Sequence, residues 1–112
     1  MNIKPVYPKR VGPTALTASD TLIFQADIRV GIERFTIVNV GASDQTLRLY
    51  VVASGGSPAT TNAIAYDMSI LANDTHIFVA PTILGVSDSI YAYGSADLNI
   101  MFQVNDIDVS II

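Results

Sequence analysis

The chain has 112 residues, half of them hydrophobic and 14% charged, and its formal net charge at pH 7 is −4. This acidic balance argues against nucleic-acid binding, which depends on neutralising phosphates, and no apolar run approaches the about 18–20 residues of a membrane-spanning helix. The absence of cysteine excludes disulfides and thiolate metal sites, and it fits synthesis in a reducing cytoplasm.

The first thirteen residues are predicted to form an extended arm. Lys4, Lys9 and Arg10 lie here among three prolines, which keep the stretch out of a helix or a central strand. No apolar run follows the basic residues, so we expect no signal peptide. We therefore divide the chain into an arm over residues 1–13 and one domain over residues 14–112. The prolines are Pro5, Pro8 and Pro13.

Hydrophobic residues alternate with period two through the rest of the chain, and no stretch shows the 3.6-residue period of an amphipathic helix. Turn residues separate about eight short strands, a spacing typical of an all-β sandwich or barrel. We predict an all-β fold: a single antiparallel two-sheet sandwich with jelly-roll-like order. The predicted strands lie within residues 13–18, 21–28, 33–40, 45–53, 63–68, 75–80, 89–94 and 98–104.

Two connections and two strand faces follow from the same pattern. The turn residues Gly41–Asp44 predict a hairpin between the strands on either side of them. The longer Gly/Ser/Pro/Thr loop over residues 54–62 is expected to cross between the sheets. One strand face is predicted to hold Leu22, Phe24, Ala26 and Ile28, and another to hold Leu47, Leu49, Val51 and Ala53.

Residues suited to catalysis are few. His76 is the one histidine, and alternation places it on the face opposite Ile77 and Val79, where we expect it to be exposed or at an interface. No cysteine is present to pair with it, and no G-x-S-x-G elbow is present for a serine nucleophile. We therefore expect no enzyme activity and no catalytic residue.

The sequence also predicts no cofactor and no metal site. Gly55 and Gly56 precede Pro58 rather than a helix N-terminus, which argues against a phosphate cradle. Asp106 and Asp108 would supply half of a calcium site, but the loop pattern D-x-[DN]-x-[DN]-G is absent.

Charge is unevenly distributed along the chain. All six basic residues lie within residues 1–48, whereas residues 49–112 contain no Lys or Arg. A bipolar layout suits docking on another protein by electrostatic complementarity. The low charged fraction, against roughly 25% in an ordinary domain, predicts apolar surface that is buried in oligomer or assembly contacts.

Residues 33–104 contain a strand ending in Asn, a GAS turn, an IAYD strand, an L-A-N-D-T turn and a D-S-I-Y-A strand. These motifs lie at Asn39, Gly41–Ser43, Ile64–Asp67, Leu71–Thr75 and Asp88–Ala92. With this series of motifs, the segment resembles small β-sandwich structural proteins of tailed bacteriophage particles.

This resemblance implies a virion component: a capsid decoration (cement or staple) protein that binds and stabilises the lattice of the major capsid protein. Its partners would be the major capsid protein and further copies of itself, as a dimer or trimer, with no nucleic acid and no membrane. Its location would be the capsid exterior, after synthesis in the host bacterial cytoplasm.

We expect both ends of the chain to carry the contacts with the capsid. The arm would lie along the capsid with its basic side chains against carboxylates, and the apolar C-terminus would add a strand or pack across a dimer axis. The candidate partner-binding residues are Lys4, Val6, Tyr7, Lys9, Arg10, Val109, Ile111 and Ile112.

Two other readings remain open at this point. A tail, baseplate or fibre component for host attachment would use Tyr91 and Tyr93, which share a strand face, or the loop over residues 54–62, to bind a glycan. A non-viral binding module of a surface assembly is the second alternative.

Overall fold

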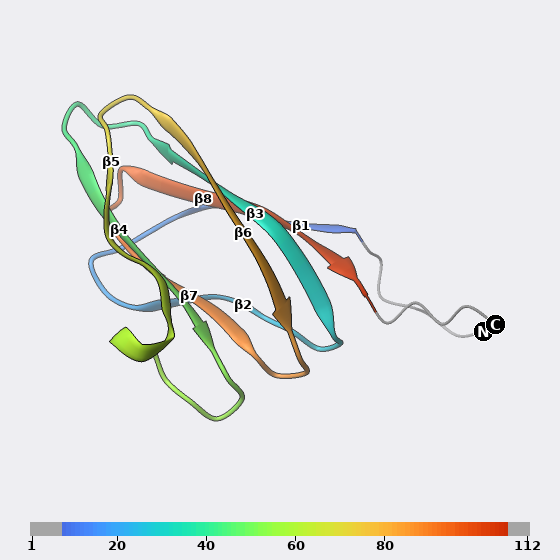
Figure 1. The fold of residues 1–112 in the computed structure, drawn as a ribbon. Coiled ribbons are helices and arrows are strands. Elements are labelled where there is room, and N and C mark those ends of the chain that lie inside the picture. Colours follow the sequence, from blue (N-terminus) through green and yellow to red (C-terminus); the bar gives the residue numbers. More distant parts are fainter. Residues whose placement is uncertain (1–7, 108–112) are drawn as a thin grey trace.

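The structure, a computed structural model, describes residues 8–107. It holds eight strands and one short 3-10 helix, η1, arranged as two four-stranded sheets packed face to face (Figure 1). The elements are β1 (Lys9–Ala15), β2 (Thr21–Gln25), β3 (Val30–Asn39), β4 (Gln45–Val52), η1 (Thr60–Asn62), β5 (Ala63–Ile70), β6 (Thr75–Leu84), β7 (Ser89–Tyr93) and β8 (Leu98–Asp106). Among these residues, no helix is long and apolar enough to cross a membrane.

The order of the strands is that of a jelly roll. Sheet A has the order β1-β8-β3-β6, and sheet B has the order β2-β7-β4-β5. All pairs are antiparallel, and each sheet combines strands from the beginning and the end of the chain. The predicted all-β sandwich of about eight strands is therefore confirmed.

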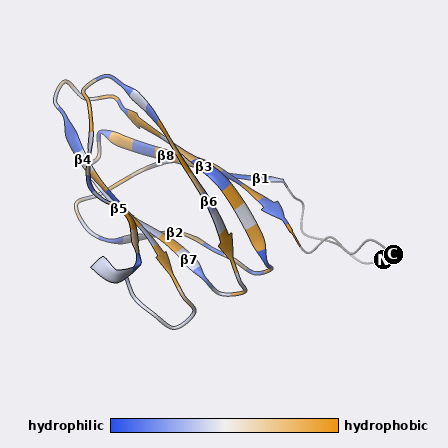
Figure 2. Ribbon diagram, in the orientation of Figure 1, coloured by the Kyte–Doolittle hydropathy of each residue, from blue (hydrophilic) through white to orange (hydrophobic). Residues whose placement is uncertain are grey.

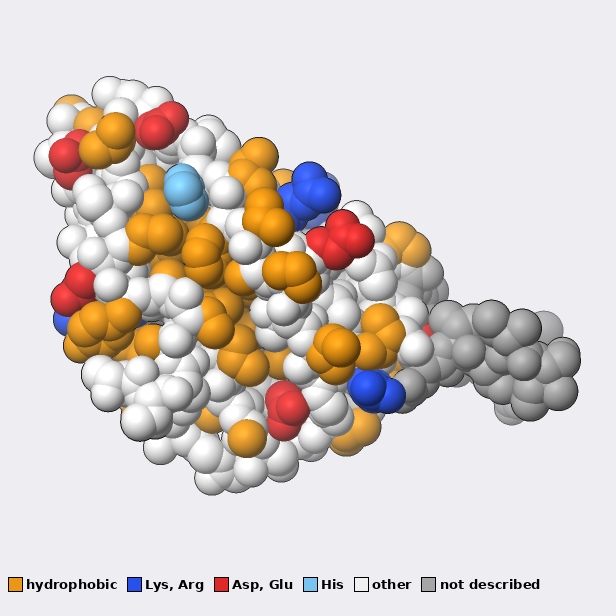
Figure 3. Space-filling view, in the orientation of Figure 1, with side chains coloured by type: hydrophobic (Ala, Val, Ile, Leu, Met, Phe, Trp, Pro, Cys, Tyr) orange, Lys and Arg blue, Asp and Glu red, His pale blue; other side chains and the backbone are white. Residues whose placement is uncertain are grey.

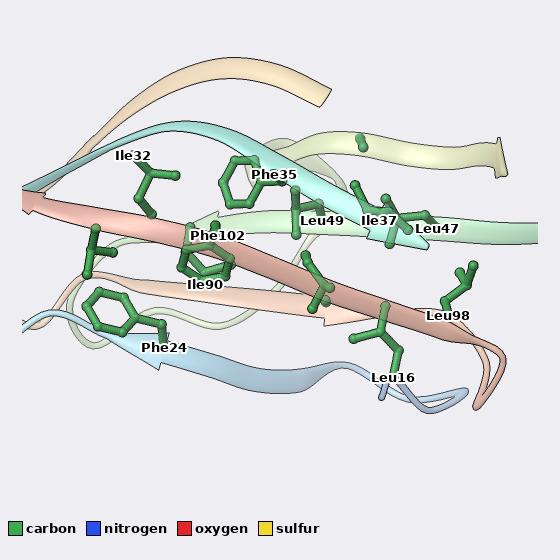
Figure 4. Packing of buried hydrophobic residues seen from close by; sticks show 14 of the residues in the cluster. Leu16, Phe24, Ile32, Phe35, Ile37, Leu47, Leu49, Ile90, Leu98 and Phe102 are labelled. Carbon is green, nitrogen blue, oxygen red and sulfur yellow. The ribbon is translucent and has the colours of Figure 1, made fainter. Parts of the chain in front are cut away.

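The core is formed by the inward faces of both sheets. Hydrophobic and hydrophilic residues alternate along β3 (Figure 2), which directs Phe35 and Ile37 inward. The ring of Phe102 lies 5.1 Å from that of Phe35 and 6.1 Å from that of Phe24, both with edge geometry. Side chains from the two sheets point toward one another throughout this layer (Figure 4). Each such buried side chain contributes roughly 1.5–3 kcal/mol through removal from water.

Both predicted connections were wrong: the predicted hairpin crosses between the sheets, and the predicted crossing joins two paired strands. β3 lies in sheet A and β4 in sheet B, so residues 40–44 cross between the sheets instead of closing a hairpin. The buried amide of Asn39 fixes this corner: its Nδ2 donates to the carbonyls of Ser43 (2.9 Å) and Ile70 (3.0 Å), and its Oδ1 accepts from the Gly41 N–H (2.9 Å). β4 and β5 instead pair within sheet B, so the loop over residues 54–62 joins neighbouring strands.

Most residues of the two predicted strand faces do point into the core, and two of them do not. Leu47, Leu49 and Val51 face the core, whereas Ala53 lies beyond the strand and is exposed. The register between β2 and β7 shifts between Leu22 and Phe24. This bulge turns Leu22 outward, where it is 48% exposed, and so the prediction that it shares a face with Phe24 was wrong.

The predicted arm also extends too far into the domain. β1 begins at Lys9 and pairs with β8 from the Lys9–Val104 position onward, so residues 9–13 belong to the sandwich. Pro13 fits because β1 is an edge strand, which needs no N–H on its outer side, and because the register shifts there between Val11 and Thr14. The first seven residues lie outside the described part.

Candidate functional site

The outer face of sheet A holds two adjoining depressions. One, of about 390 Å³, lies over β1, β8 and β3 and is called here the Arg10–Arg34 depression. The other, of about 540 Å³, lies over β3, β6 and the end of β8 and is called the Ile83–Ile107 depression. The first is lined by Arg10, Glu33, Arg34, Thr36, Met101, Phe102, Gln103 and Asn105. The second is lined by Gly31, Ile32, Glu33, Pro81, Thr82, Ile83, Gln103, Asn105 and Ile107.

An irregularity in β3 places charged side chains over this face. The register of β3 shifts between Ile32 and Arg34 against β6, and between Gly31 and Phe35 against β8. As a result, Glu33 and Arg34 are consecutive and both exposed. Their ion pair is long, with 3.6 Å between Nη2 and Oε2, and both side chains are mostly in water. A pair of this kind is weak, so Arg34 remains available for a carboxylate on a partner.

Polar groups fill the floor between the two depressions. Arg10 pairs in register with Gln103, and the Gln103 Nε2 donates to the Asn105 Oδ1 at 3.0 Å. Neighbouring guanidinium and amide groups can bind carboxylates and backbone amides of a protein. Neither depression is lined by a cysteine or a histidine.

The structure brings the two ends of the described chain together at this face. Lys9 and Arg10 are exposed at the start of β1. Lys9 lies opposite Val104, so the chain enters β1 and leaves β8 at the same end of the sandwich. Ile107 lines the Ile83–Ile107 depression. The other predicted partner-binding residues lie outside the described part of the chain; they are Lys4, Val6, Tyr7, Val109, Ile111 and Ile112.

On β6 the exposed side chains are hydrophobic. We expected His76 to be the exposed residue, with Ile77 and Val79 on the opposite face. Ile77 is 53% exposed and Val79 is 68% exposed, whereas His76, on the opposite face as predicted, is half-buried. The prediction that His76 and Ile77 lie on opposite faces was therefore right, but the face that points to water is the one that holds Ile77. Hydrophobic side chains gather around this histidine on the surface (Figure 3).

The outer face of sheet B carries a compact cluster of tyrosine and arginine. The Arg48 guanidinium lies 4.4 Å from the ring centroid of Tyr66 and 4.7 Å from that of Tyr93. Its Nε donates to the Asp67 Oδ1 at 2.6 Å, and this hydrogen bond is the main cause that raises the pKa of Arg48 above its ordinary value. Tyr50, opposite Tyr91 in the sheet, is buried at this face.

Burial is the main cause that raises the pKa of the Tyr50 hydroxyl; the charge of Asp20 adds to this shift, and the hydrogen bond with Arg48 opposes it. Only part of this cluster could be predicted from the sequence. Alternation placed Tyr91 and Tyr93 on one face, but the pairing of Arg48 with Tyr93 depends on the order of the strands. Because the guanidinium of Arg48 is already engaged by Asp67 and two rings, this cluster mainly fixes β4, β5 and β7 to one another.

Three acidic residues lie at the end of the sandwich far from Lys9. Asp44, Asp74 and Asp97 lie in three connections that contact one another there. Within residues 8–107, no group of three or more His, Asp or Glu side chains is placed to hold a metal ion, and Asp108 lies outside this range.

The chain matches no protein-family model, no curated protein and no solved structure.

Proposed function

We propose that this protein is a non-catalytic capsid decoration protein of a tailed bacteriophage, which binds the major capsid protein through the outer face of sheet A. The observation that carries the proposal is the meeting of three features on one side of the sandwich: the exposed Lys9 and Arg10, the Arg10–Arg34 depression, and the pairing of the start of β1 with the last part of β8. The resemblance of residues 33–104 to virion sandwich proteins supports the same function.

In this proposal the protein binds the capsid through several separate contacts at once. The depressions offer guanidinium and amide groups to a protein surface, and the apolar Ile83 and Ile107 adjoin them. Contacts that residues 1–7 and 108–112 make with the capsid would add to those of the depressions, and several weak contacts on a lattice add up to strong retention. The exposed arginines would also steer the chain toward an acidic capsid surface.

The test is co-sedimentation of the purified chain with capsids that lack it. We expect Arg10→Gln combined with Arg34→Gln to lower capsid occupancy at a fixed protein concentration at least about 10-fold, with a smaller effect at high salt. The control, Thr46→Glu combined with Thr61→Glu, makes the same change in net charge at exposed positions away from the face. Equal occupancy of the two double variants would refute the role of this face.

A second function, host attachment through a glycan, is favoured by one observation. Tyr66 is 47% exposed beside Tyr93 and Arg48, and an exposed tyrosine ring next to fixed polar groups can stack on a sugar. Tyr66→Ala would abolish binding to host cells under this function and would leave capsid occupancy unchanged under the first.

A further inference from the structure

The strand β6 forms an edge of sheet A and has no neighbour on its outer side among residues 8–107. It is ten residues long and contains no charged residue. A long, hydrophobic edge strand exposes a row of N–H and C=O groups that readily pair with another strand, and proteins normally block such edges. β6 is therefore the place where the fold is open to association.

The other three edge strands carry blocking features. β1 has Lys9, Arg10 and a proline within an irregular register. β2 is only five residues long and contains a bulge. β5 has Asp67 at a positive φ of 52° and two register shifts against β4. In β6 the corresponding features, Pro81 and a register shift, lie in its second half, so Thr75–Ala80 has neither charge nor proline.

Hydrophobic surface surrounds this unblocked segment on two sides. Ile77 and Val79 project from the outer face and are each more than half exposed. Phe78 and Ala80 point toward the core but are only partly buried. Met68, on the edge strand β5 of the other sheet, is also only partly buried. Figure 3 shows this hydrophobic surface beside the histidine.

We propose that β6 pairs antiparallel with β6 of a second copy of this chain, across a two-fold axis. The absence of charge selects this partner: two copies of an uncharged strand meet without like-charge repulsion, whereas a charged partner strand would find no counter-charge on β6. An isologous contact also buries the exposed Ile77 and Val79 of both copies at once. The pairing joins the two copies of sheet A into one eight-stranded sheet.

The symmetry has a consequence for docking, and this part of the inference rests on the proposed function. A two-fold axis that relates antiparallel neighbours in one sheet is perpendicular to that sheet, so the outer faces of both copies point to the same side. The Arg10–Arg34 depressions of the dimer would then face one surface together. A repeating capsid lattice would bind both of them, and the dimer would gain avidity over a single copy.

The test begins with sedimentation equilibrium of the full chain at micromolar concentrations. We expect a species of twice the 12.0 kDa chain mass. The change Val79→Lys, at a side chain 68% exposed, should give a folded monomer with an unchanged far-ultraviolet circular dichroism spectrum. The matched control is Val86→Lys, at a side chain 62% exposed but outside any strand, and it should remain a dimer. A monomeric wild type, a trimer, or a dimer that survives Val79→Lys would overturn the proposal.

Cross-linking gives a second measurement that does not depend on how the lysine variant folds. The natural chain has no cysteine, so Ile77→Cys combined with Val79→Cys reports contacts of these positions when the antiparallel pairing is centred on residues 77–79, within the unblocked segment Thr75–Ala80. This variant should form disulfide dimers at least about 10-fold faster than Val40→Cys combined with Val86→Cys, because paired strands hold the thiols at high effective concentration. Equal rates would refute the β6 interface, even if capsid binding through the arginines is found.

Discussion

The corner at Asn39 allows the fold to be tested quantitatively. Asn39 is 1% exposed, and its amide makes three hydrogen bonds, to Ser43, Ile70 and Gly41, that turn the chain from sheet A into sheet B. Asn39→Ala removes all three and leaves backbone groups without partners. At roughly 1 kcal/mol for each bond, the free energy of unfolding should fall by about 2–4 kcal/mol. This is a large share of the roughly 5–15 kcal/mol typical of a single domain.

Urea denaturation followed by circular dichroism measures this loss directly, since the midpoint shifts while the slope stays constant. Asn62→Ala is the control, because Asn62 also makes two side-chain hydrogen bonds, but within an exposed loop. It should cost less than about 1 kcal/mol, since water replaces the lost partners. If Asn39→Ala were no more destabilising than Asn62→Ala, the assignment of the corner to the buried amide would be refuted.

Three further changes test other parts of the structure. Phe102→Ala, at the centre of the aromatic core, should lower the free energy of unfolding by about 3–5 kcal/mol in the same assay. Gly12→Ala should destabilise more than Gly55→Ala: both glycines have positive φ, but a Cβ at Gly12 would collide with the carbonyl of Ile100, whereas Gly55 has open space. Folding raises the pKa of Tyr50, so the neutral hydroxyl favours the folded state. This contribution to the free energy of unfolding is fully present below pH 10.0 and is lost as the pH rises through the folded pKa. When the free energy of unfolding is measured at increasing alkaline pH, it should therefore fall less in Tyr50→Phe than in the natural chain.

The class of fold could be predicted from the sequence because it depends on local alternation. Period two identifies each strand whichever strand it pairs with. Pairing could not be predicted in the same way. The turn at Gly41–Asp44 has the composition of a hairpin, and only the buried contact between Asn39 and Ile70, 31 positions apart, makes it a crossing.

The candidate site was partly predictable for a related reason. Lys9 and Arg10 were identified as exposed basic residues, but their proline-rich surroundings concealed that they begin an edge strand. In β6 both faces are apolar, so alternation could not decide whether His76 or Ile77 points to water. The Arg48 cluster arises from neighbours across three strands, and no single segment contains its pattern.

The central claim, that the chain decorates a capsid, is tested most directly by its copy number in purified phage particles. Quantitative mass spectrometry would compare peptides of this chain with those of the major capsid protein of the same particle. The account predicts an amount near a simple ratio to the major capsid protein, because each lattice site offers the same docking surface. A handful of copies per particle would indicate a tail component, and absence from particles would contradict the account.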